Sequence, residues 1–193
     1  MAIVQERCRL SCCRFHAPEH AVEVRVDADI ARCDTELGQE SLQPPTGLAD
    51  ENASDAGYGR EILAPALGTV VYARNDVPDN THPGKEPDHN GAYYRALHDP
   101  VMALAGNCVI IDHGNSEYSV MMHMQPGSVT VRVGDRVATG QVIGRLGNSG
   151  SATGPHVHYE LQSGPRLWQY QSLPFRFQNI DAPLHRGEYF VAK

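Results

Sequence analysis

Short runs in which apolar and polar residues alternate recur along most of the chain, and this pattern predicts β-strands. The run from Ala21 to Val26 shows the alternation clearly, and Tyr118 to Met124 forms a second well-bounded run. Alternation places one face of a strand against a core. Further short strands are expected at 61–65, 69–74, 107–112, 129–133, 142–146 and 156–161. The tail segments 173–180 and 187–192 are candidates for closing strands.

Two long stretches interrupt these runs and have no clear periodicity. Residues 39–59 and 75–100 are rich in proline, glycine and polar side chains, so both are expected to be loops that border a functional groove. Histidines at 82, 89 and 98 in the second stretch are expected to be exposed. Many short strands without a convincing long helix predict an all-β fold, a small antiparallel β-sandwich or a flattened barrel.

Composition agrees with one compact domain. The chain has 193 residues, of which 41% are hydrophobic, and it contains 18 glycines and 13 prolines. We expect an irregular segment at 1–15 followed by a single domain over 16–193. The formal charge of −7, with no basic run, argues against a nucleic-acid partner. No run of about 18 apolar residues is present, so no membrane span is expected.

The N-terminal residues and the cysteines give further expectations. Its first residues, MAIVQERCRLSCCRF, lack the apolar core of a secretory signal peptide. The five cysteines are an odd number, so at least one stays unpaired within a monomer. Cys108 lies inside an apolar strand and is expected to be a small core residue.

The segment GNSGSATGPHVHYEL, residues 147–161, carries the strongest chemical signal. His156 and His158 are two residues apart on an expected strand, so both rings leave the same face. Such a pair suits a site in which one histidine binds a metal ion and the other transfers protons. Two solvent-facing histidines are the alternative, and only the flanking sequence decides between them.

Those flanks resemble the lysostaphin/LytM-type zinc peptidases, which cut peptide cross-links in bacterial peptidoglycan. The similarity rests on three segments: GDRVATGQVIGRLGNSGSATGPHVHYE (134–160), EILAPALGTVVYA (61–73) and GNCVIIDHGNSEYSVMMHM (106–124). Together they span roughly residues 60–165. The resemblance implies the duplicated hybrid motif fold, one Zn²⁺ ion and a peptidoglycan peptide as substrate. It also implies a location in the periplasm or cell wall.

Site residues follow from the resemblance by position. His158 matches a zinc ligand, whereas His156 and His123 match a pair that transfers protons. Three protein ligands would leave a fourth position on zinc for a water molecule, whose pKa the metal lowers toward 7. The alternative for His123 alone is a partly buried histidine at a strand end. His113, at the turn after VIID, is expected to have a structural role.

The chain departs from the family in the first metal motif, His-x-x-x-Asp, where it has Gly57 and Glu61. A long-loop branch of the family is similar in the segment EHAVEV, in the VPDN loop (77–80) and in the LPFRF tail. In that register Glu23 matches the carboxylate ligand and His20 the second nitrogen ligand, with His16 as the alternate. The competing interpretation is that these three residues are solvated strand and loop residues.

Two functions of different class therefore remain open. The first is a zinc-dependent endopeptidase that hydrolyses stem or cross-bridge peptides of peptidoglycan. The second is a non-catalytic LytM-like module that binds a partner or wall peptide and regulates another hydrolase. They differ in whether a nitrogen ligand and a carboxylate complete the site beside His158.

Overall fold

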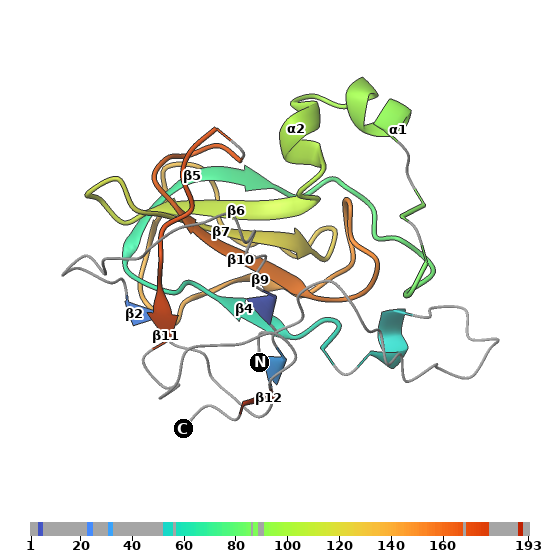
Figure 1. Ribbon diagram of the computed structural model, residues 1–193, viewed down its shortest axis with the longest axis horizontal. Coiled ribbons are helices and arrows are strands. Elements are labelled where there is room, and N and C mark those ends of the chain that lie inside the picture. Colours follow the sequence, from blue (N-terminus) through green and yellow to red (C-terminus); the bar gives the residue numbers. More distant parts are fainter. Residues whose placement is uncertain are drawn as a thin grey trace.

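The structure is a computed structural model of the chain (Figure 1). It describes residues 4–5, 23–24, 31–32, 52–55, 57–85, 87–88, 91–167, 169–177 and 189–190. For the strand segments 4–5, 23–24, 31–32, 176–177 and 189–190, the description covers the backbone.

A six-stranded sheet forms the centre of the molecule (Figure 1). In spatial order its strands are β1 (Val4–Gln5), β10 (Val157–Gln162), β7 (Tyr118–Met124), β6 (Asn107–Asp112), β5 (Gly68–Arg74) and β8 (Arg136–Val137). All neighbours pair antiparallel except β1 and β10, which pair parallel. Consecutive strands β5, β6 and β7 are sheet neighbours, although the connection between β5 and β6 is long and contains α1 and α2.

Three two-stranded sheets complete the β structure among the described residues. They pair β4 (Glu61–Leu63) with β9 (Val142–Arg145), β2 (Glu23–Val24) with β11 (Arg176–Phe177), and β3 (Ala31–Arg32) with β12 (Tyr189–Phe190). The helices are short: η1 (Asn52–Ser54), α1 (Gly91–Ala96) and α2 (Pro100–Ala103). The expected all-β class is confirmed, and in the described part of the chain the sheets form no closed barrel.

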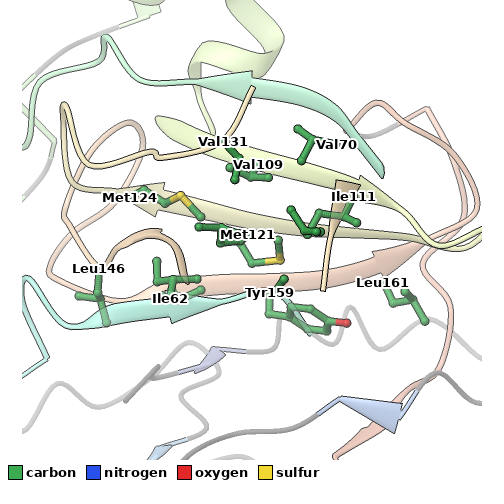
Figure 2. Close-up of a cluster of buried hydrophobic side chains, with 14 residues drawn as sticks. Ile62, Val70, Val109, Ile111, Met121, Met124, Val131, Leu146, Tyr159 and Leu161 are labelled. Atoms are coloured by element: carbon green, nitrogen blue, oxygen red, sulfur yellow. The ribbon is translucent and has the colours of Figure 1, made fainter. Parts of the chain in front are cut away.

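The main core lies between the six-stranded sheet and the β4–β9 pair. Val109 and Ile111 of β6 and Met121 of β7 face Ile62 of β4 in one buried cluster (Figure 2). Residues at the alternate positions of β6, such as Ile110, belong to a second cluster on the other face of the sheet. A central strand buried on both faces explains why residues 108–111 (CVII) of β6 are all apolar.

Part of the stretch 75–100, expected to be an irregular loop, is helical. Helices α1 and α2 lie together at one end of the sheet (Figure 1). Met102 of α2 is fully buried in the second cluster with Leu167. Pro100 opens α2, where its fixed φ suits a first helical position. Helices of six and four residues are too short to show a helical period in the sequence.

The strand expected at 129–133 does not form. Thr130 donates one backbone hydrogen bond to the carbonyl of Ile143 (3.1 Å), and a turn follows. The Asp135 carboxylate closes that turn by accepting from the backbone N–H of Arg132 at 2.8 Å. Val131 is still buried in the main core, so its apolar character reflects packing without a strand.

The expected strand at 21–26 exists as β2, and it pairs with the LPFRF tail rather than with the six-stranded sheet. Glu23 lies opposite Arg176 in a parallel register. The parallel neighbour of β10 is instead Val4–Gln5, within the segment expected to be irregular. No helix of the described residues has the length and apolar character required to cross a membrane.

The glycine-rich loop, residues 147–154, packs directly against the segment that follows α2. Gly106 has φ +67°, and a Cβ there would come within 2.4 to 2.5 Å of Ser149 atoms. Ser151 donates its backbone N–H to the carbonyl of Leu104 at 2.9 Å. Backbone therefore touches backbone at Gly106, which leaves no space for a side chain.

Replacing Met102 by alanine tests whether α2 belongs to the core. We expect Met102→Ala to lower the free energy of unfolding by about 2–5 kcal/mol, because it leaves a cavity. The neighbouring Val101 is 37% exposed, and Val101→Ala should change stability by about 0.5 kcal/mol or less. Urea unfolding of both variants provides the measurement. Equal, small effects would show that α2 is a surface appendage.

Replacing Gly106 by alanine tests the close approach to the glycine-rich loop. Gly127 is the matched control, because its φ is +75° and nothing lies within 4 Å of an added Cβ. Gly127→Ala should cost about 1–2 kcal/mol, from the left-handed backbone alone. Gly106→Ala should cost about 1–3 kcal/mol more, because of overpacking. Equal costs in urea unfolding would contradict the contact.

Candidate active site

Strand β10 fixes which way its histidine points. Val157 and Tyr159 belong to the main core, so His158 between them faces the opposite side of the sheet. His158 lies opposite Met122 of β7, a member of the second cluster on that same side. His156 precedes the strand by one residue, and its backbone N–H donates to the carbonyl of Gly147 at 3.3 Å.

A β-bulge brings His123 to the same side. Strict alternation would place His123 with Met121, in the main core and away from His158. The register between β6 and β7 instead moves from Val109–Met121 to Asn107–Met124, so β7 carries one extra residue. His123 has φ +63°, in the left-handed region. Bulges of this kind redirect a side chain, and here the bulge moves the His123 ring toward β10.

The three histidine rings form one group, here called the histidine cluster (His123, His156 and His158). The ring centroids of His123 and His156 lie 4.7 Å apart, and those of His123 and His158 lie 6.0 Å apart. His123 is buried, with 5% exposure, whereas the other two are partly exposed. The cluster therefore has one buried member and two members that solvent can reach.

Backbone carbonyls set the tautomer of two of these rings. Nδ1 of His123 lies 2.8 Å from the carbonyl oxygen of Ser149, and Nδ1 of His156 lies 2.8 Å from that of Gly154. A carbonyl oxygen only accepts, so each Nδ1 carries the hydrogen. In the neutral rings the lone pair is then on Nε2. A histidine oriented in this way can accept and return a proton at Nε2.

His113 is different, because both of its ring nitrogens hold the scaffold together. Nδ1 donates to the carbonyl of Leu67 at 2.9 Å, and Nε2 lies 2.7 Å from the hydroxyl of the buried Ser119. The first bond connects the β4–β5 turn to the β6–β7 hairpin, and the second lies within that hairpin. They agree with the structural role expected from the sequence.

Two other ionisable groups near the cluster in sequence are core residues. Burial raises the pKa of the Cys108 thiol to about 12, so the buried thiol stays protonated. Burial likewise raises the pKa of Tyr159, whose side chain lies in the main core. Both side chains are packed in the hydrophobic core, Tyr159 in the main cluster and Cys108 in the second one.

Buried amides behind the glycine-rich loop were not identified from the sequence as site residues. Asn80 is 2% exposed and donates its side-chain N–H groups to three carbonyls of the loop. The Ser149 hydroxyl donates to the carbonyl of Met124 at 2.7 Å and accepts from the backbone N–H of Asn107 at 2.9 Å. The VPDN match included Asn80, but nothing in a lone asparagine shows that its amide is buried.

The residues at the usual positions of the first metal motif do not supply a ligand beside His158. Gly57 has no donor atom, and the Glu61 carboxylate lies 3.2 Å from the Arg145 guanidinium in a half-exposed pair. Ile62 points into the core, so Glu61 points outward from β4. Among the described residues, no group of three histidine, cysteine, aspartate or glutamate side chains could hold a metal ion.

The predicted ligands of the N-terminal register lie outside the described side chains. His16 and His20 are outside the described residues altogether. Glu23 is described only in its backbone, as the first residue of β2. The imidazole of His158 suits zinc chemically, but the described residues alone do not form a complete zinc site.

Comparison with known proteins places these residues in a family. The model for peptidase family M23 matches residues 53–169, which include the whole histidine cluster. Peptidoglycan DD-endopeptidase ShyA of Vibrio cholerae is 47% identical over 124 residues, covering 62% of this chain and 22% of ShyA. ShyC of the same organism is 31% identical over 158 residues, covering 78% of this chain and 31% of ShyC. The chain thus corresponds to less than a third of the length of either relative.

Among solved structures, the catalytic domain of the M23 protein EnpA from Enterococcus faecalis is similar. It has a TM-score of 0.42 and 26% identity, and the alignment covers 60% of this chain and 68% of that one. The family match spans more than half of the chain and confirms the resemblance inferred from its motifs. The chain belongs to peptidase family M23.

Proposed function

We propose that this chain is the catalytic domain of a zinc-dependent endopeptidase that hydrolyses stem or cross-bridge peptides of peptidoglycan. The observation that carries the proposal is the histidine cluster, assembled on one side of the sheet inside the M23 match. Relatives named peptidoglycan DD-endopeptidases support the substrate class. They also support a place of action in the periplasm or cell wall.

The roles proposed for the cluster follow from its hydrogen bonds. His123 and His156 each hold a hydrogen on Nδ1 through a backbone carbonyl, so Nε2 is the atom that exchanges protons. One histidine accepts the proton of the attacking water at Nε2. The other, in its protonated form, donates a hydrogen bond from Nε2 to the tetrahedral intermediate. Burial of His123 keeps its ring in one orientation, whereas partial exposure of His156 lets it meet a substrate.

Zinc is the proposed cofactor, with His158 as one ligand. Glu23 supplies the carboxylate, and His20, with His16 as the alternate, supplies the second nitrogen. A bound zinc ion lowers the pKa of its water toward neutrality. The pairing of β2 with β11 supports this register, because it joins the two segments, EHAVEV and LPFRF, that resemble the long-loop branch.

A non-catalytic LytM-like module is the second candidate. The observation that favours it is the loss of the usual first metal motif, since Gly57 has no donor and Glu61 pairs with Arg145. In that case the histidine cluster would bind a wall peptide or a partner protein without hydrolysis. Zinc content separates the two candidates.

The histidines of the HxH motif should respond differently to substitution. We expect His158→Ala to abolish stoichiometric zinc in the purified protein, because it removes a ligand. His156→Ala should retain zinc yet lose cleavage of purified peptidoglycan or of synthetic cross-linked stem peptides. Metal analysis and product chromatography measure the two effects. Full zinc in both variants would show that the roles are assigned wrongly, and no zinc in the wild type would favour the non-catalytic module.

The two possible registers of the carboxylate ligand can be compared in the same protein. Glu23→Gln should lower the zinc affinity by about 10-fold or more, because a neutral amide replaces the charged ligand. Glu61→Gln, the matched control at the usual family position, should leave affinity unchanged, because Glu61 faces outward and pairs with Arg145. Competition with a chelator measures the affinity. Loss of zinc in Glu61→Gln alone would show that Glu61, and not Glu23, is the carboxylate ligand.

A further inference from the structure

A single side-chain amide, that of Asn80, contacts three carbonyls of the glycine-rich loop. Nδ2 of Asn80 lies 2.7 Å from the carbonyl oxygen of Asn148, 2.9 Å from that of Gly150 and 3.0 Å from that of Ala152. These are alternate residues of the loop. The carbonyl of Ser149, which lies between the first two, accepts from His123 Nδ1 instead. Asn80 therefore holds the carbonyls on one side, and the intervening carbonyl contacts the histidine.

The orientation of the Asn80 amide is fixed by its other end. Oδ1 accepts the backbone N–H of Asp88 at 2.9 Å, so Nδ2 is the atom that faces the loop. The backbone of Asn80 adds to this attachment, since its N–H donates to the carbonyl of Asn148 at 3.0 Å. Asn80 is 2% exposed, so water does not replace these bonds readily. Only a donor can occupy this position, because three carbonyl oxygens surround it.

The carbonyl of Ser149 has a direct consequence for the histidine cluster. Because it only accepts, it keeps the hydrogen of His123 on Nδ1 and the lone pair of the neutral ring on Nε2. The Ser149 backbone is further restrained by its hydroxyl, which donates to the carbonyl of Met124. A shift of this loop would release the ring and allow the other tautomer.

We propose that Asn80 is a positioning residue that fixes the tautomer and orientation of His123 through the carbonyls of the glycine-rich loop. As far as proton transfer by His123 is concerned, the inference rests on the proposed function. The positioning itself does not, because the tautomer is a property of the protein without substrate.

The test replaces the Asn80 amide by a carboxylate of the same shape. Asn80→Asp keeps an acceptor for Asp88 and places oxygen where Nδ2 donated. Gln162→Glu is the matched control. Gln162 is fully buried, and its amide donates to the carbonyl of Gly164 at 2.6 Å, away from the glycine-rich loop.

Side-chain ¹⁵N NMR at a pH where the ring is neutral provides the readout, with His123→Gln used to assign the signals. Wild type and Gln162→Glu should show well-separated Nδ1–H and Nε2 signals for His123. In Asn80→Asp the two signals should move toward each other, as the ring exchanges between tautomers. Unchanged signals in a folded Asn80→Asp, or equal changes in both variants, would overturn the proposal. If either variant fails to fold, Asn80→Ala and Gln162→Ala are compared by the same criterion.

Cleavage kinetics then separate this proposal from the proposed function. In an active protein, Asn80→Asp should lower kcat by about 10- to 100-fold, with little change in KM. An unchanged kcat in an active Asn80→Asp would contradict positioning for catalysis. A wild type that shows the Nδ1–H signature but cleaves nothing would refute the proposed function and leave the positioning role intact.

Discussion

The histidine cluster depends on the left-handed backbone at His123. A non-glycine residue with φ +63° carries a cost of about 1–2 kcal/mol, so surrounding contacts must hold it there. Three hydrogen bonds do so: the N–H of His123 donates to Ala105, its carbonyl accepts from Gly147, and its ring donates to Ser149. Without the bulge, the His123 side chain would face the main core; with it, the ring joins the histidine cluster. The strained backbone conformation of β7 is therefore found at the residue that belongs to the candidate site.

The glycine-rich loop is buried, and burial of an irregular segment creates an unusual demand for hydrogen-bond partners. Asn148, Ser149 and Gly150 are all buried, so their backbone groups require protein partners. Residues of the stretch 77–106 supply several of these partners. The Asn80 amide donates to carbonyls of the loop, and the carbonyl of Leu104, after α2, accepts from the backbone N–H of Ser151. The stretch 77–106 therefore helps to hold the glycine-rich loop beside the histidine cluster. Its attachment to the loop explains why buried asparagines gather here although isolated buried amides are costly.

Much of the fold could be predicted because its signals are local. The bounds expected for β6 and β7 match the structure, since each is a compact apolar run ended by a polar turn. The common direction of His156 and His158 follows from spacing alone. The bulge at His123 could not be predicted, because it arises from a register shift between two strands that alternation does not show. The prediction of a strand at 129–133 was wrong for a related reason. Val131 is buried without being in a strand, and the sequence does not distinguish a buried valine of this kind from a strand valine.

The ligands of the first metal motif could not be located from local sequence alone. In the usual register, a carboxylate at position 61 would stand beside the histidines, yet Ile62 fills the core and directs Glu61 outward to Arg145. A ligand set distributed over the chain requires strands from distant segments to meet, and here β2 pairs with β11 across about 150 residues. Such pairings depend on tertiary contacts rather than on any short motif. The cluster on β7 and β10 is consequently the part of the site that the motifs specify. Under the proposed function, the remaining ligands would come from the N-terminal strand through such long-range pairing.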